Sequence, residues 1–259
     1  MLRSMQELKN YAIGATDGEV GHVADFFFDD DMWTIRYLVV ETGSWLMSRK
    51  VLISPFSLMD ADWLHKRLPV RITRDQVKNS PDIDTQKPVS RQQEMFYADY
   101  YDYPYYWGGT GLWGDGLYVP MAVPSATRVA ASELSVDNPH LQSCQAIVGY
   151  DVHASDGDIG HVQGMLVDEE TWAIRFLVVD TSNWWLGHQV LIAPSWISDR
   201  SWSDSKVSVS MTRDAVQSSP RFDSTEQLNR QHEMDLYRHY DRPSYWEREI
   251  TAPKVKDSQ

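Results

Sequence analysis

The chain has 259 residues, and its 37 Asp and Glu against 24 Lys and Arg give a formal net charge of −13. This acidic balance disfavours direct contact with nucleic-acid phosphate, which attracts a field of Lys and Arg. A single Cys excludes an internal disulfide and a Cys-based zinc cluster, and with no apolar leader and no apolar run of roughly 18–20 residues we expect a cytoplasmic protein without a membrane span.

An internal duplication organises the chain. With an offset of 139 residues, Leu2 falls on Leu141 and Trp107 on Trp246, and 42 of the 106 aligned positions are identical without a gap. A match of this length predicts two copies of one unit of ordinary domain size. We expect a first repeat with its C-terminal helix, a Gly/Pro-rich linker, a second repeat with its helix, and a disordered tail, over residues 1–107, 108–139, 140–250 and 251–259.

The first half of each repeat is expected to form strands. In the first copy, Asp17-Gly18 between extended runs predicts a tight hairpin, because Gly takes the positive φ that such a turn needs. A strand over 20–29 leads into an acidic turn at 29–31. The next strand, 33–40, becomes apolar on both faces, and a further strand covers 51–53.

The end of each repeat is expected to be helical. Thr73 followed by Gln76 is a capping box, so a short helix begins there and stops near Ser80-Pro81. A longer aromatic helix follows at about 90–102, and at 229–241 in the second copy.

The aromatic helix of each copy has a repeating pattern of side chains. Apolar residues at three-residue spacing predict one apolar stripe per helix. These residues are Met95, Ala98 and Tyr101 in the first copy, and Met234, Tyr237 and Tyr240 in the second. Arg91 and Glu94, like Arg230 and Glu233, are three residues apart, and we expect these ion pairs on the solvent face.

The strand-rich part of both copies carries one motif. It reads Asp-Gly-x-x-Gly-His-Val, an acidic turn, Trp-x-Ile-Arg-Tyr/Phe-Leu-Val-Val-Glu/Asp-Thr, a Trp loop and Val-Leu-Ile-x-Pro, within about residues 2–85 and 141–224. This pattern resembles the PRC-barrel family, which is named for the cytoplasmic domain of the photosynthetic reaction-centre H subunit and includes the C-terminal domain of the ribosome-maturation factor RimM. The aromatic helices that end at Trp107 and Trp246 resemble the tails of stand-alone bacterial members.

The resemblance implies a fold class: mainly β with short helices, in two tandem small antiparallel β-barrels, each followed by a short helix and an aromatic amphipathic helix. It implies no catalytic residue and no cofactor, because the family shares no active-site motif, and its attested members bind other proteins. By family analogy alone, a role in ribosome assembly or beside an electron-transfer complex is an alternative. Since two homologous units on one chain can pair like a homodimer, we also expect pseudo-twofold symmetry.

His22 and His161 occupy the same place in the two copies and are weak ligand candidates. A neutral imidazole can bind a metal or carry a proton near pH 7, although a strand His bonded to backbone or water is the simpler interpretation. The acidic turns at 29–31 and 168–170 offer oxygen ligands for a hard cation but lack the spacing of a calcium loop. A metal or small-ligand site built from these residues is therefore the alternative function, and we assign no metal.

The sequence predicts no enzyme. It contains no nucleophile elbow, no Walker loop and no dinucleotide-binding fingerprint after a strand. Cys144, the one thiol, aligns with Met5, and a position that accepts Met indicates apolar packing.

Aromatic residues are in excess, with 11 Trp, 13 Tyr and 7 Phe. Trp45 stands in a loop between two strands, and Trp184-Trp185 stands at the matching place in the second copy. Because Trp and Tyr are enriched at binding hot spots, these loops are the candidate docking sites, with packing on the same domain as the alternative. We therefore expect a non-enzymatic adaptor that docks on a protein partner or on itself, with a homo-oligomer as one possible form.

Overall fold

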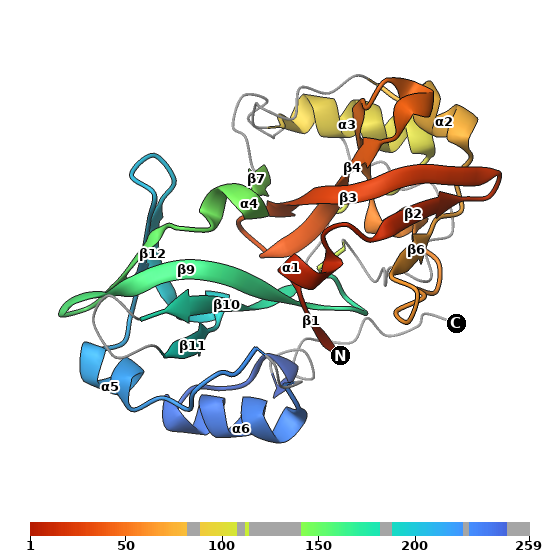
Figure 1. Ribbon diagram of the computed structural model, residues 1–259. Helices are drawn as coiled ribbons and strands as arrows, with labels where there is room; N and C mark the ends of the chain where they lie inside the picture. Colours follow the sequence, from red (N-terminus) through yellow and green to blue (C-terminus); the bar gives the residue numbers. More distant parts are fainter. Residues whose placement is uncertain (82–88, 108–111, 114–140, 182–187, 225–227, 248–259) are drawn as a thin grey trace, which may run out of the picture. The chain divides into compact units, whose positions relative to one another are not determined.

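The computed structural model describes residues 1–81, 89–107, 112–113, 141–181, 188–224 and 228–247 (Figure 1). In these residues the chain is mainly β with a few short helices, as the sequence predicts. None of the helices described there is long and apolar enough to cross a membrane. Of the predicted linker only Leu112 and Trp113 are described, and the predicted tail at 251–259 lies outside the described residues.

The chain divides into two compact units. Unit 1 contains Met1 and residues 3–147, together with residues 167–174. Unit 2 contains Leu2, residues 148–166 and the chain from Arg175 onward. Two segments of the second sequence repeat, 141–147 and 167–174, thus belong to unit 1.

The first sheet has five strands in one path and a sixth at its side. The strands are β2 (Ala12–Ala15), β3 (Gly18–Asp29), β4 (Thr34–Thr42), β5 (Lys50–Ile53), β6 (Arg67–Pro69) and β7 (Leu141–Ser143). The path runs β5–β4–β3–β2–β6, and β7 pairs with β3 beside this path. All pairs are antiparallel except β2 with β6, which is parallel.

The second sheet repeats this order and is longer by one strand. Its strands are β1 (Leu2–Ser4), β8 (Asp151–Ala154), β9 (Gly157–Asp168), β10 (Ile174–Asp180), β11 (Gln189–Ile192), β12 (Ile197–Ser201) and β13 (Lys206–Val209). The path runs β11–β10–β9–β8–β13–β12, and β1 pairs with β9. Each sheet therefore includes the N-terminal strand of the other sequence repeat.

The predicted antiparallel barrels are corrected by the strand order. The path in the first sheet ends at β5 on one side and at β6 on the other, so the described strands form an open sheet. The path in the second sheet likewise ends at β11 and at β12, so both sheets are open in the described residues. In the first copy the segment 58–62 meets residues 67–70 only in isolated bridges, and Pro69 has no N–H to donate to it. In the second copy Ser208 stands at this position and pairs with Asp199, so β12 joins the sheet there. The parallel pair in each sheet is the second departure from the prediction.

The hairpin predicted at Asp17-Gly18 is confirmed. β2 and β3 pair from Ala15 opposite Gly18, and Gly18 has a φ of 145°. Three residues later, a Cβ on Gly21 would lie 2.0 Å from the carbonyl oxygen of Glu41 on β4. The close approach of the two backbones explains why both copies have Gly directly before the His-Val pair.

The α-helices of the described residues are α1 (Met5–Leu8), α2 (Arg74–Lys78), α3 (Arg91–Tyr101), α4 (Cys144–Ile147), α5 (Arg213–Gln217) and α6 (Arg230–His239). The helices α2, α3 and α6 begin where the sequence predicts, and α5 begins at the position that matches α2. The short helices α1 and α4 are not among the predicted elements. Thr73 and Ser90 both form complete capping boxes, with Gln76 and Gln93 as their partners. These boxes satisfy backbone N–H groups that would otherwise lack a partner at each helix start.

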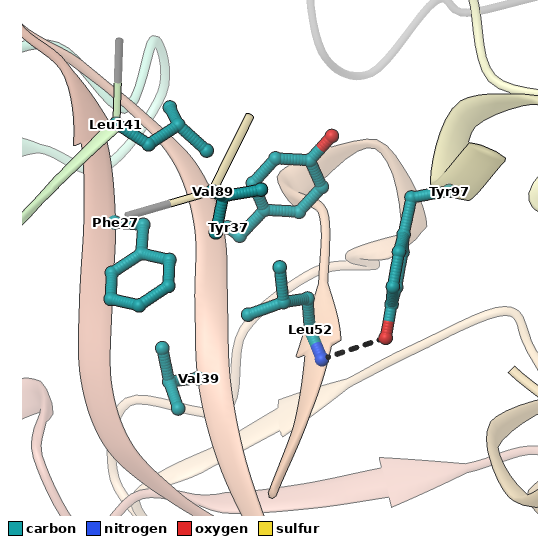
Figure 2. Packing of buried hydrophobic residues seen from close by; sticks show 7 residues of the cluster. All are labelled: Phe27, Tyr37, Val39, Leu52, Val89, Tyr97 and Leu141. Atoms are coloured by element: carbon teal, nitrogen blue, oxygen red, sulfur yellow. Dashed lines mark hydrogen bonds between the residues drawn. The ribbon is translucent and has the colours of Figure 1, made fainter. Parts of the chain in front are cut away.

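A buried apolar cluster joins α3 to the first sheet. Figure 2 shows its members, which are Phe27, Tyr37, Val39, Leu52, Val89, Tyr97 and Leu141. The Tyr97 hydroxyl accepts a hydrogen bond from the Leu52 backbone N–H at 3.3 Å, and the rings of Tyr37 and Tyr97 meet edge to face. Leu141, on β7, is the member that comes from the second sequence repeat.

Candidate functional site

Trp45 lies in the turn between β4 and β5 and packs against its own unit. Its indole N–H donates a hydrogen bond to the carbonyl oxygen of Val20 at 2.7 Å. The guanidinium of Arg74 lies 4.2 Å from the centre of the ring, at cation–π distance. The ring is half-buried and serves as the anchor of the loop.

The most exposed apolar side chain of the Trp45 loop is Met47. It is 94 % exposed and follows the 3-10 turn Ser44–Leu46. Met47 and Ser48 both have left-handed backbone conformations, with φ of 53° and 54°, so the turn is tight. The matching candidates of the second copy, Trp184 and Trp185, lie outside the described residues.

The two weak ligand candidates lie on strands. His22 is exposed on β3 opposite Glu41, and His161 is half-buried on β9 opposite Asp151. The first acidic turn begins seven residues after His22, which is about 23 Å along a strand at about 3.3 Å per residue. β3 therefore holds His22 away from the acidic turn.

The carboxylates of the first acidic turn lie close together, and Asp29 is engaged in contacts within the protein. One ligand oxygen from each of Asp29, Asp30 and Asp31 lies within 4.8 Å of the others. Asp29 accepts the backbone N–H groups of Asp31 and Met32 at 2.9 and 3.3 Å. Its other oxygen pairs with Arg36 at 3.0 Å, so a positive charge already faces it. These contacts show that Asp29 stabilises the turn and pairs with Arg36.

The second acidic turn has the same local role. Asp168 accepts the backbone N–H groups of Glu170 and Thr171, as Asp29 does in the first copy. Glu169 pairs with Arg3 at 2.8 Å and with the N-terminal amino group of Met1 at 3.4 Å. These ion pairs lie within unit 1 and bind the start of the chain to residues 167–174.

A buried polar cluster in unit 1 connects α3 to β3 and β4. We call Asp29, Arg36, Arg91, Glu94 and Tyr106 the Arg–Glu–Tyr cluster. Each of these five residues is at most 8 % exposed, and the Arg36 and Glu94 residues are each 1 % exposed. Arg91 pairs with Glu94 at 3.1 Å and donates to the Tyr106 hydroxyl at 2.8 Å, and that hydroxyl donates to Glu94.

Aromatic rings enclose the guanidinium groups of this cluster. Arg36 lies 3.8 Å from the ring centre of Tyr106 and 4.8 Å from that of Trp113. Arg36 also donates to the carbonyl oxygen of Leu112. Arg91 lies 4.4 Å from the ring centre of Trp107. The aromatic residues that follow α3 thus cover two buried arginines. These aromatic residues therefore have a packing role within unit 1.

Burial changes the acid–base properties of the cluster. It raises the pKa of Glu94 from the ordinary 4.5 to about 7, against the opposing effect of Arg91 and the Tyr106 hydroxyl. Burial likewise raises the pKa values of Tyr106 and Tyr37 well above 10. At 1 % exposure, Glu94 lies away from solvent, so we interpret the cluster as a structural connection between helix and sheet.

The second copy repeats the contacts among Arg, Glu and Tyr. Arg230 pairs with Glu233 at 3.3 Å and donates to the Tyr245 hydroxyl at 2.8 Å, and that hydroxyl donates to Glu233 at 2.9 Å. Arg175 lies 3.9 Å from the ring centre of Tyr245. The side chain of Arg230 is 56 % exposed against 7 % for Arg91, so the second pair is the more open one.

The predicted position of the ion pairs on the solvent face is wrong, whereas the predicted apolar stripe is confirmed at Ala98, Tyr237 and Tyr240, which are 4 %, 4 % and 8 % exposed. The pairs Arg91–Glu94 and Arg230–Glu233 form, but the acid of each pair is buried. The buried face of α3 therefore includes two charged residues, while Met234 on α6 is 40 % exposed. The aromatic residues after each helix cover the ion pair and so place its Glu on the buried face. Residue spacing along one helix cannot show this covering.

The duplication contained a signal for this cluster. Surface residues are free to diverge after a duplication, whereas a buried charge needs its partner. The cluster positions hold the same residue types in both copies: Asp29 and Asp168, Arg36 and Arg175, Arg91 and Arg230, Glu94 and Glu233, and Tyr106 and Tyr245. Five identical polar positions of this kind indicate a packed network.

The comparisons with known proteins give no family for this chain. No family model matches it, and no curated protein matches it. The resemblance to the PRC-barrel family therefore remains a prediction that depends on the motif in the sequence.

Proposed function

We propose that this chain is a non-enzymatic protein-interaction module of the PRC-barrel type, made of two tandem related copies. In this proposal it docks on a folded protein partner through the loop from Gly43 to Arg49. The observation that supports it is the exposed Met47 beside an anchored Trp45. The pseudo-twofold relation of the copies belongs to the same proposal, and two well-separated lobes in small-angle scattering would contradict it.

The local geometry of the loop favours docking. Trp45 is anchored on Val20 and Arg74, so the turn is ordered before a partner arrives. An ordered loop loses less conformational entropy on binding than a loose one. Met47 is an adaptable apolar side chain, of a type that is frequent at binding surfaces, and it faces solvent almost completely.

The single thiol supports the non-enzymatic part of the proposal. Cys144 is buried, and burial raises the pKa of its thiol well above 9. The nucleophilic form of cysteine is the thiolate, which such an environment disfavours. Packing explains this residue, in agreement with Met5 at the matching position.

Replacing Met47 with Asp is expected to abolish partner capture without unfolding the protein. In affinity purification from the native host followed by mass spectrometry, we expect at least a tenfold loss of the partner that the wild-type chain retains. The free energy of unfolding should change by less than about 0.5 kcal/mol, because the side chain is exposed. Trp45→Ala should also weaken capture, since it releases the anchor of the loop.

Leu64 supplies the matched control for this experiment. It is 85 % exposed in a different turn of unit 1, so Leu64→Asp makes the same change of polarity elsewhere. Capture that is unchanged in Leu64→Asp and lost in Met47→Asp supports the proposal. Equal capture by wild type and Met47→Asp would contradict it.

A further inference from the structure

The first sheet accepts a segment that begins the other sequence repeat. β7 pairs with β3 in the register Phe27 to Ser143, Phe28 to Gln142 and Asp29 to Leu141. The helix α4 follows at once, and residues 141–147 belong to unit 1 (Figure 1). We call residues 141–147 the donor segment and the β3 surface that it covers the acceptor.

Three apolar side chains anchor the donor segment. Leu141, Cys144 and Ile147 are 3 %, 5 % and 1 % exposed. Leu141 reaches the apolar cluster beside Phe27 and Tyr37 (Figure 2). The segment thus fills part of the core of unit 1.

A polar contact adds specificity to this pairing. Asp25 on β3 accepts the Ser143 hydroxyl at 2.6 Å and the Gln145 backbone N–H at 3.1 Å. The Ser143 oxygen in turn accepts the Ala146 N–H at 3.0 Å, which caps the start of α4. On β9 the position of Asp25 is occupied by Gly164, which has no side chain to make this contact. The hydrogen bonds from the donor segment to a carboxylate are therefore specific to the acceptor on β3.

We propose that the acceptor on β3 also takes the donor segment of a second copy of this chain, which yields a dimer by exchange of residues 141–147. A donor from another chain would make the same contacts with the acceptor. Exchange of an identical element needs no new interface, which makes it an inexpensive route to a dimer. The 27 residues of 114–140 separate the donor from Trp113, and a stretch of that length can reach at most about 90 Å. Connection length therefore does not confine the donor to its own acceptor.

Complementary variants test the exchange in the full chain. Leu141→Asp disables the donor, because a carboxylate does not enter an apolar cluster, and leaves the acceptor sequence intact. Asp25→Lys disables the acceptor at a half-buried position and leaves the donor intact. We expect each variant alone to have a mass near 29.9 kDa by light scattering. After refolding together, the fraction of dimer, about 60 kDa or twice the chain mass, should be at least tenfold higher.

Two further arms keep the test decisive if a variant folds poorly. Wild-type chain refolded at high protein concentration should give the dimer, and refolding at low concentration should give the single chain. Gln142→Ala, at a half-buried donor position outside the anchors, should behave like wild type. A chain that keeps the mass of one copy in both the variant mixture and the concentrated wild-type refolding would overturn the proposal. A dimer that forms equally from Leu141→Asp alone would also overturn it.

Discussion

Replacing Arg36 with Met is expected to lower the free energy of unfolding by about 3–5 kcal/mol, the range for breaking a buried ion pair by removing one partner. The Arg36 residue is 1 % exposed, and its guanidinium pairs with Asp29 at 3.0 Å between the rings of Tyr106 and Trp113. The substitution leaves the carboxylate of Asp29 buried without its counter-charge. Urea unfolding followed by tryptophan fluorescence measures the loss.

Two controls separate this electrostatic effect from lost packing. The double variant Asp29→Asn with Arg36→Met removes both charges and keeps an amide oxygen to accept the turn N–H groups. It should lose less stability than the sum of the two single variants, because neither change then leaves a charge unpaired. Arg67→Met, at an exposed arginine, should change stability by less than about 0.5 kcal/mol. A loss below about 1 kcal/mol for Arg36→Met would contradict the structural role of the cluster.

The second large effect is a decrease in stability between pH 5 and pH 8 that depends on Glu94. Its pKa is about 7 in the folded chain and 4.5 for an ordinary Glu, so the folded state retains a proton that the unfolded chain releases. For a raised carboxyl pKa, the contribution to stability is complete below pH 4.5 and decreases until pH 7. At about 1.4 kcal/mol per pKa unit, the decrease above pH 5 amounts to about 2–3 kcal/mol. Arg91, Arg36, Asp29 and the Tyr106 hydroxyl are the charged and titratable groups that act on Glu94.

Glu94→Gln isolates this contribution from the rest of the acidic chain. A neutral amide resembles the protonated acid, so the variant should unfold near the wild-type urea concentration at pH 5. It should lose about 2–3 kcal/mol less than wild type between pH 5 and pH 8. Glu233→Gln is the matched substitution in the second copy, where the partner Arg230 is 56 % exposed. If wild type and Glu94→Gln change in parallel over this pH range, the raised pKa is wrong.

The sequence alone was sufficient to predict those features of the fold that depend on residues close together along the chain. Asp17-Gly18 predicted the first hairpin, and Thr73 with Gln76 predicted the start of α2. The chemistry of each feature is local, since a positive φ or a capping side chain acts within a few residues. The apolar role of Cys144 was also predictable, because the duplication places Met5 at the same position.

Features that depend on distant residues were not predictable in this way. The segments that begin at Leu2 and at Leu141 have similar sequences. Their residue patterns therefore do not show that β1 pairs with β9 and β7 with β3. One difference that favours the donor segment on β3 is Asp25, which bonds Ser143, against Gly164 at the matching position of β9. The burial of Glu94 likewise depends on the aromatic residues that follow α3, and helical spacing alone assigns Arg91 and Glu94 equally well to a solvated face.

The central structural claim is that each sheet is completed by the N-terminal strand of the other repeat. Nuclear Overhauser contacts between backbone protons test it directly in the unmodified chain. The account predicts contacts that join residues 27–29 of β3 with residues 141–143 of β7, in the register given by the sheet. Contacts that join 141–143 with β9, and none to β3, would show that each repeat keeps its own strand and would contradict the account.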